Sequence, residues 1–243
     1  MSFIIKDKVA FVTGANRGIG KAIVESLLQH GAKKVYLGVR NPESTKALEK
    51  QYGEKVATTQ TDISSTDSVN KAAAEATDVD LVVNNAGIML STTPLAENIF
   101  ESLAREIDVN VYGLVRIANA FAKALERNKG ALVQLNSVVS MKNFLQETTY
   151  SASKAASYSI TQGLKDAFAE KGVQVLSVHP GPIETDMGKR AGFDNLASAE
   201  SVSEGIIDSL EKGDFLLFPD DMAKMIEGAY QSYADNIILK DFS

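Results

Sequence analysis

Short apolar runs alternate with longer amphipathic stretches along almost the whole chain, and this alternation restricts the fold more than any other feature. The runs are rich in Val and Leu and lack the polar alternation of a strand with one face in water. Strands that are covered on both faces and are each followed by a helix predict right-handed crossovers and a parallel sheet. We therefore expect a single α/β domain over residues 1–243, with a doubly wound sheet in a three-layer α/β/α arrangement.

Turn residues and changes of periodicity give the approximate bounds of each element. The expected strands are 8–13, 34–39, 56–61, 81–84, 131–137, 173–179 and 215–218. The expected helices are 18–30, one that starts at Pro42, 65–76, 95–107, 109–127, 150–170, 201–212 and 221–234. In a sheet of this kind the ligand lies beyond the carboxyl ends of the strands, so the residues there matter most for function.

Composition excludes several classes of protein. The chain is 44% hydrophobic and 23% charged, which excludes a disordered chain. It has no Cys and only two His, His30 and His179, so disulfides, thiolate zinc sites, iron–sulfur clusters and His-rich metal sites are excluded and we expect no metal. No apolar run is long enough to span a bilayer, and Lys6, Asp7 and Lys8 interrupt the N-terminal segment where a signal peptide needs an apolar stretch. We therefore expect a cytoplasmic protein with no membrane partner.

The acidic residues are concentrated near the C-terminus. Residues 184–243 hold 13 acidic and 5 basic side chains, and the whole chain has a net charge of −6. An acidic surface repels polyphosphate, so we expect no nucleic-acid partner. We interpret the acidic segment itself as a solvated surface. Met222 and Met225, three residues apart in an expected helix, are predicted to be core residues.

Three glycines follow the first expected strand: Gly14, Gly18 and Gly20. Without Cβ atoms the backbone can turn tightly and let a pyrophosphate approach the positive N-terminus of the next helix. A plain tight turn is the alternative for the glycines alone. The spacing Gly-x-x-x-Gly-x-Gly also differs from the common G-x-G-x-x-G dinucleotide fingerprint.

This spacing resembles that of the short-chain dehydrogenase/reductase family, and the match continues along the chain. Asp62 and Ile63 follow the third strand, where the family places a carboxylate near the adenine ring. The sequence Asn-Asn-Ala-Gly at 84–87 resembles the family motif that braces the sheet and lines the cofactor cleft. Ser137, Tyr150, Lys154 and Asn110 match the family's catalytic tetrad. The resemblance covers about residues 5–187 and implies a Rossmann-type domain that binds a nicotinamide dinucleotide.

The resemblance also implies which residues hold the cofactor. They lie in the glycine loop, after the second, third and fourth strands, on the Tyr–Lys helix, and in the segment after His179, where a Pro-Gly backbone faces the nicotinamide. The expected cofactor-binding residues are Gly14, Asn16, Arg17, Gly18, Ile19, Gly20, Arg40, Asp62, Ile63, Asn85, Ala86, Gly87, Tyr150, Lys154, Pro180, Gly181, Ile183 and Thr185.

The end of the second strand predicts the choice of cofactor. Enzymes that use NAD place an Asp or Glu there to bind the ribose hydroxyls. Here that position is Val39, Arg40 follows it, and Arg17 in the glycine loop adds a second cation. Each Arg alone is typical of a solvated surface. With no acid at position 39, the two guanidinium groups together suit a dianionic 2′-phosphate and predict NADP(H).

Tyr150 and Lys154 are four residues apart and share one face of a helix. That pair alone arises easily by chance, but the full tetrad does not. A phenol has an ordinary pKa near 10, and a cation beside it, from Lys154 and the oxidised nicotinamide, favours the phenolate. We expect Tyr150 to be the general acid/base and Ser137 to hydrogen-bond the substrate oxygen.

The resemblance assigns two supporting roles to the remaining members of the tetrad. Lys154 is expected to hold the nicotinamide ribose, and Asn110 to interrupt its helix and position a water in the proton relay. A strand-end cap for Ser137 and a helix cap for Asn110 are the structural alternatives. His179 is expected to be a packed strand-end histidine, because the tetrad already supplies the acid.

The expected function is an NADPH-dependent reductase that converts a ketone or aldehyde to an alcohol, reversibly. The alternative is a catalytically silent NADP(H)-binding sensor or scaffold on the same fold. Phe144 is expected to line the substrate pocket and favours an apolar or aromatic carbonyl compound.

The C-terminal part of the chain departs from the family. Gly188 and Gly192 bracket a short polar stretch, and we expect the segment that contains it, about 187–200, to be a substrate lid. Residues 213–243 form a divergent extension without the Gly-Gly strand that helps many relatives to build a tetramer. We therefore expect a homodimer through the helices at 109–127 and 150–170, with a tetramer as the alternative.

Overall fold

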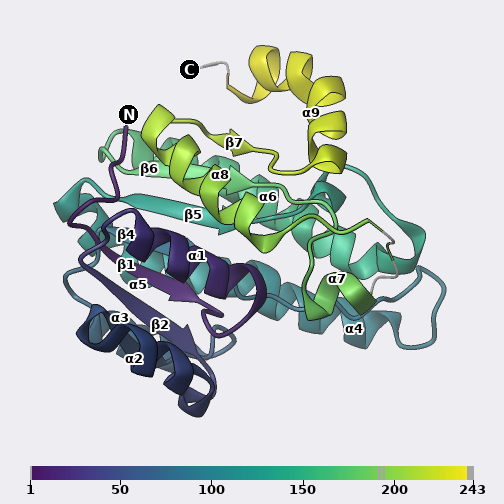
Figure 1. Ribbon diagram of the computed structural model, residues 1–243. Coiled ribbons are helices and arrows are strands. Elements are labelled where there is room, and N and C mark those ends of the chain that lie inside the picture. The colour runs from purple at the N-terminus through teal and green to yellow at the C-terminus, as the bar shows by residue number, and fades with distance from the viewer. Residues whose placement is uncertain (1, 191–192, 194, 240–243) are drawn as a thin grey trace.

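The computed structural model describes residues 2–190, 193 and 195–239, and a seven-stranded parallel sheet forms its centre (Figure 1). The strands are β1 (Val9–Thr13), β2 (Lys34–Val39), β3 (Val56–Gln60), β4 (Leu81–Asn84), β5 (Ala131–Leu135), β6 (Gln174–Val178) and β7 (Leu216–Leu217). Their order is β3-β2-β1-β4-β5-β6-β7, which confirms the doubly wound α/β prediction. The order reverses direction between β1 and β4, so the carboxyl ends of these two strands flank the crevice where a ligand belongs.

Helices cover both faces of this sheet. They are α1 (Gly18–Gln29), α2 (Lys46–Tyr52), α3 (Thr66–Glu75), α4 (Ile99–Glu106), α5 (Gly113–Asn128), α6 (Thr148–Ala169), α7 (Asp186–Arg190), α8 (Ala199–Lys212) and α9 (Asp221–Tyr233). A π-helical turn, Ile107–Tyr112, joins α4 to α5 where the sequence predicts two separate helices. The helix predicted from residue 95 starts only at Ile99, and its first expected apolar residue, Leu95, is 95% exposed.

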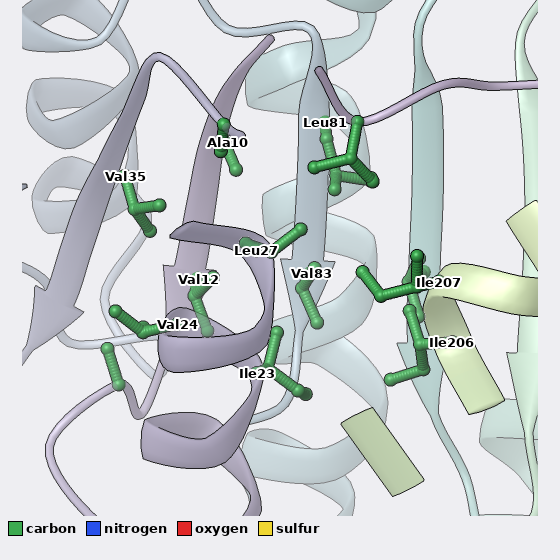
Figure 2. Close-up of a cluster of buried hydrophobic side chains, with 14 of the residues drawn as sticks. Ala10, Val12, Ile23, Val24, Leu27, Val35, Leu81, Val83, Ile206 and Ile207 are labelled. Carbon is green, nitrogen blue, oxygen red and sulfur yellow. The ribbon is translucent and has the colours of Figure 1, made fainter. Parts of the chain in front are cut away.

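One side of the sheet packs against α1 and α8 (Figure 1). Val12 and Val83 point from β1 and β4 toward Ile23 and Leu27 of α1, and Ile206 of α8 closes the same cluster (Figure 2). Each of these side chains is at most 1% exposed. Full burial of one such side chain stabilises the fold by about 1.5–3 kcal/mol, so this layer fixes α1, and with it the glycine loop, against the sheet.

The opposite side of the sheet packs against α3, α5 and α6. Phe11, which alternates with Val12 along β1, points to this side, and its ring centroid lies 4.7 Å from that of Phe121 on α5. Tyr158 and Phe168 place α6 in the same cluster. The helix that carries Tyr150 and Lys154 is therefore held along most of its length by the core.

The predicted core role of the two methionines in α9 is wrong for Met225, which is 70% exposed. Met222 is half-buried and packs beside Val138 and Phe218, while Ala223 is fully buried. The reason is the position of α9 at the outer edge of the molecule, beyond β7, where only a narrow face of the helix meets the protein (Figure 1).

Among residues 2–190, 193 and 195–239, no helix is long and apolar enough to cross a membrane. Within the same part of the chain, no group of three or more His, Cys, Asp or Glu side chains is placed to hold a metal ion.

Candidate active site

The glycine loop connects β1 to α1 in a conformation that only glycine adopts without strain. Gly14 and Gly18 have φ angles of +65° and +51°. A Cβ on Gly20 would overlap the Gly14 carbonyl oxygen and lie 2.6 Å from Asn85 Nδ2. Arg17 stands at the N-cap of α1 without a side-chain cap, so its side chain leaves the first amides of the helix free. The cradle thus fits a pyrophosphate at a helix N-terminus.

Residues 84–87 brace this loop. The Thr13 hydroxyl donates to Asn84 Oδ1 and accepts from the amides of Asn85 and Ala86. Asn85 Nδ2 donates to the Thr13 and Gly14 carbonyl oxygens, at 2.9 and 3.3 Å. The Asn85 amide group therefore fixes the loop to the end of β4, and the expectation that this motif braces the sheet agrees with these contacts.

The segment 180–185, which follows β6, meets the glycine loop at Thr185. A Cβ on Gly18 would lie 3.0 Å from Thr185 Cγ2. Thr185 Oγ1 donates to the Ile183 carbonyl oxygen at 3.3 Å, and Gly181 is held by its amide, which donates to Asp220 Oδ2 at 2.7 Å. The predicted cofactor segment 180–185 is thus brought to the mouth of the loop, and Asp220, which also caps α9, holds its start.

Tyr150 and Lys154 lie one turn apart on α6 and are both buried, at 9% and 4% exposed. Lys154 Nζ lies 5.7 Å from the centre of the Tyr150 ring and donates to the Leu135 carbonyl oxygen at 2.6 Å. The Ser137 hydroxyl lies beside the phenol and lowers its pKa. A Cβ on Gly87 would lie 3.7 Å from Lys154 Nζ, so the fourth-strand motif reaches the same spot. The structure therefore brings the predicted phenol, hydroxyl and ammonium groups together.

The net effect of the protein's own groups is to raise the pKa of Tyr150, although Ser137 lowers it. Burial is the largest cause, and the charges of Glu106 and Glu147 act in the same direction. Burial also lowers the pKa of Lys154 to about 8. Positive charge on Lys154 and on a bound oxidised nicotinamide would favour the phenolate against these effects.

Asn110 lies in the π-helical turn between α4 and α5, so it interrupts its helix as predicted. Its side chain is fully used: Oδ1 accepts from the Ile88 amide, and Nδ2 donates to the Ile88 carbonyl oxygen and to Ser153 Oγ, each at 2.9 Å. Asn110 thus ties the segment after residues 84–87 to α6.

The adenosine end of the cleft is more acidic than the sequence predicts. Arg40 is exposed, but Arg17 Nη1 is 2.8 Å from Asp186 Oδ2 in an ion pair whose side chains are about two-thirds exposed. A cavity of about 430 Å³ beside Arg40 is lined by Lys71 and by three acidic residues, Asp62, Asp67 and Glu75. The pKa of Asp62 is lowered, first of all by a hydrogen bond from Ser64. The three acidic residues all lie in the stretch 62–75, and nothing in the sequence indicates that this stretch faces Arg40, which precedes it by more than 20 residues.

His179 is a packed strand-end residue, as predicted. It is fully buried, Ser177 Oγ lies 2.8 Å from its Nε2, and its ring stacks on Phe218. Burial lowers its pKa to about 3, so it stays neutral. Phe144 makes an edge contact with Phe193, with ring centroids 6.5 Å apart.

The sequence matches a family model described as short chain dehydrogenase over residues 8–195. The chain belongs to the short-chain dehydrogenase/reductase family. It is an oxidoreductase of that family, whose enzymes bind a nicotinamide cofactor and act on small molecules. The match ends before α8, so the divergent C-terminal extension expected from the sequence lies outside it.

Three proteins illustrate how similar this chain is in sequence and in structure to known proteins. An uncharacterized oxidoreductase of Staphylococcus saprophyticus is 36% identical over 211 residues, which are 81% of this chain and 90% of the relative. A short-chain dehydrogenase from Burkholderia cenocepacia, solved in complex with NADP, is 32% identical with a TM-score of 0.88, covering 98% of this chain and 100% of that one. A 7α-hydroxysteroid dehydrogenase complexed with NADH shares the fold at 22% identity, with a TM-score of 0.80 and coverage of 88% and 92%. Since both cofactors occur on this fold, the choice depends on the chain's own residues.

The site contains two residues that the sequence analysis missed, Glu106 and Glu147. Both are buried carboxylates close to Tyr150. A glutamate in a helix is usually solvated, and no motif marks either position. The expected lid lies partly outside the described residues, since Gly192 and two neighbours are not described; its start forms the short helix α7.

Proposed function

We propose that this short-chain dehydrogenase is an NADP(H)-dependent enzyme that reduces a ketone or aldehyde to an alcohol, reversibly, with Tyr150 as the general acid/base. The observation that carries the proposal is the meeting of Tyr150, Ser137 and Lys154 at the carboxyl end of β5, next to a glycine cradle that excludes any Cβ. A sensor or scaffold on the same fold has no need of all three groups.

The residues divide the chemistry among themselves. A bound nicotinamide supplies the hydride that the carbonyl carbon receives. Ser137 donates a hydrogen bond to the substrate oxygen, where negative charge develops, and Tyr150 gives that oxygen a proton. Lys154, buried one turn from Tyr150, binds the nicotinamide ribose, and Asn110 positions a water in the relay that returns a proton to Tyr150.

NADP(H) is preferred because Val39 is buried and apolar where NAD-dependent enzymes place an acid, and because Arg40 is exposed beside it. Arg17 contributes less than Arg40, since it must leave Asp186 to reach a phosphate. Asp62 borders the adenine, and the three carboxylates near Arg40 reduce the preference without reversing its sign.

Exposed apolar side chains on α5 bear on the assembly of the protein. A homodimer through α5 and α6 is supported by Tyr112 and Val115, which are 54% and 36% exposed at the start of α5.

The Phe144–Phe193 contact supports an apolar or aromatic substrate enclosed by the segment 187–200. Protection of that segment from hydrogen exchange on binding of NADP and a product would support its role as a lid.

The decisive experiment follows NADPH absorbance with a panel of aliphatic and aromatic ketones and aldehydes. We expect at least one aromatic member to be reduced and the Tyr150→Phe variant to lose this activity. NADPH binding without turnover of any member would instead favour the sensor.

A further inference from the structure

The C-terminal segment that carries β7 and α9 lies outside the family match, which ends at residue 195. It nevertheless packs against the turn that begins at Ser137. Val138, the next residue, is 3% exposed and lies in one apolar cluster with Phe218 and Ala223. Met222 packs against the same cluster. A segment beyond the family match therefore supports the turn that carries the Ser137 hydroxyl.

Asp220 makes the polar part of this contact. Its side chain is 6% exposed, and each of its two oxygens accepts a backbone hydrogen bond. Oδ2 accepts from the Gly181 amide at 2.7 Å, and Oδ1 accepts from the Ala223 amide at 3.0 Å and so caps α9. No ion pair to Asp220 is found among residues 2–190, 193 and 195–239. The two amides and the positive N-terminus of α9 therefore stabilise this buried charge.

The capping of α9 alone does not account for an aspartate at this position. Asn and Ser cap helices about as well as Asp, and one acceptor atom is enough for a cap. The carboxylate differs in presenting two acceptor oxygens and no donor, which is what two facing amides require. Gly181 also lets the carboxylate approach closely, because a Cβ on Gly181 would lie 2.6 Å from Asp220 Oδ1. The second oxygen of Asp220 thus serves the peptide group between Pro180 and Gly181.

That peptide group is held at both ends. Its amide donates to Asp220, and its carbonyl oxygen, on Pro180, accepts from the Val138 amide at 3.0 Å and from Ser137 Oγ at 3.2 Å. A peptide group is planar and rigid, so a rotation that takes its N–H away from Asp220 also takes its carbonyl oxygen away from the turn at Ser137. Asp220 and Ser137 are therefore joined through a single rigid group.

We propose that Asp220 is a positioning residue for Ser137, which fixes the Pro180–Gly181 peptide and, through it, the turn that sets where the Ser137 hydroxyl lies. The proposal rests on the proposed function, in which Ser137 donates a hydrogen bond to the substrate oxygen. A hydrogen bond of this kind stabilises the charge that develops in the transition state. A displacement of the donor by about 1 Å can slow such a reaction by about 100-fold. The β7–α9 segment is thus part of the support of the active site.

The test observes the Pro180–Gly181 peptide directly. It is the only Pro-Gly pair in the sequence, so ¹³C-carbonyl proline and ¹⁵N-glycine together label a single amide signal. Asp220→Ser keeps a cap for α9 but offers one oxygen to the two amides. We expect the Gly181 amide proton to move upfield, as the loss of a charged acceptor requires, and the assigned Val138 amide signal to move with it. Asp221→Asn removes a charge from the exposed next residue, and as the matched control it should leave both signals in place.

Activity gives the second readout. The kcat for carbonyl reduction by Asp220→Ser should fall by about 10- to 100-fold, while the KM for NADPH changes much less, because the lost interaction is one made in the transition state. In a Ser137→Ala background the same change should slow the reaction little further, because the group that Asp220 positions is already gone. Asp221→Asn should keep the kcat of the unmodified protein.

A Gly181 or Val138 signal that stays in place in Asp220→Ser, or an equal loss of kcat with and without the Ser137 hydroxyl, would overturn the proposal and leave Asp220 a helix cap only. If Asp220→Ser does not fold, Asp220→Thr, which caps with the same single oxygen and fills more of the space, decides by the same measurements. Absence of any carbonyl reduction by the unmodified protein would overturn the proposed function instead, since the two amide signals need no turnover.

Discussion

Replacement of Arg40 by Leu tests the origin of the cofactor preference. Arg40 is exposed, and no ion pair to it is found among the described residues, so its guanidinium is free to meet a 2′-phosphate. A charge-assisted hydrogen bond contributes about 1.5–3 kcal/mol when well formed. Solvent reduces that to about 1–2 kcal/mol at an exposed site. Arg40→Leu should therefore lower kcat/KM for NADPH relative to NADH by about 5- to 30-fold.

Replacement of Arg17 should affect the preference for NADPH less than replacement of Arg40. Its guanidinium is paired with Asp186 at 2.8 Å, and an exposed pair of this kind contributes about 0.2–1 kcal/mol. Arg17→Leu should therefore cost NADPH less than Arg40→Leu. Asp186→Asn, which releases Arg17, should raise the preference for NADPH by about 1.5- to 5-fold.

The assay is kcat/KM for both cofactors with one carbonyl substrate, at low and at high salt. Salt should shrink the difference between the cofactors, because the pocket is open to solvent. The double change Val39→Asp with Arg40→Leu should turn the preference toward NADH by repelling the 2′-phosphate. If the unmodified protein uses NADH as well as NADPH, or if Arg40→Leu leaves the ratio unchanged, the two arginines are surface residues and the assignment is wrong.

Three further changes test other parts of the account. Gly20→Ala should abolish detectable NADPH binding by fluorescence, because its Cβ would overlap the Gly14 carbonyl oxygen; retained affinity would contradict the cradle. Leu27→Ala, at a fully buried site, should lower the free energy of unfolding in urea by about 2–5 kcal/mol, and a loss below 1 kcal/mol would argue against the α1 packing. Burial lowers the pKa of His179 to about 3, so unfolding takes up a proton below the ordinary histidine pKa of about 6.5. The melting temperature should therefore fall as the pH drops from about 6.5 toward 3, and His179→Gln should flatten this dependence; an equal slope in the variant would show that other groups cause it.

The sequence predicts the sheet well because its strands are short runs buried on both faces. β2 and β4 have the bounds expected from their apolar residues, and the parallel arrangement of the sheet follows from the alternation with helices. Elements at the surface are less predictable. Leu95 and Met225 are apolar but exposed. The helical periodicity therefore predicted a start for α4 that is too early and a core position for Met225 that the structure does not show.

The motifs predict which residues meet at the site but not what surrounds them. Tyr150, Ser137 and Lys154 come together as expected, because α6 packs across the end of β5, where Lys154 donates to the Leu135 carbonyl oxygen and Ser137 follows the strand. The partners Arg17 and Asp186 are 169 residues apart, and nothing local indicates their contact. Glu106 and Glu147 carry no sequence signal either, since their burial depends on how α4 and α6 pack against each other.

Tyr150→Phe tests most directly whether Tyr150 transfers the proton, because this change removes the hydroxyl and keeps the buried ring. NADPH consumption under single-turnover conditions, with a carbonyl substrate from the panel, should slow by at least about 100-fold, the usual scale of general acid–base catalysis. NADPH affinity, measured by fluorescence on the same samples, should remain close to that of the unmodified protein. A Tyr150→Phe enzyme that keeps most of its rate would contradict the account.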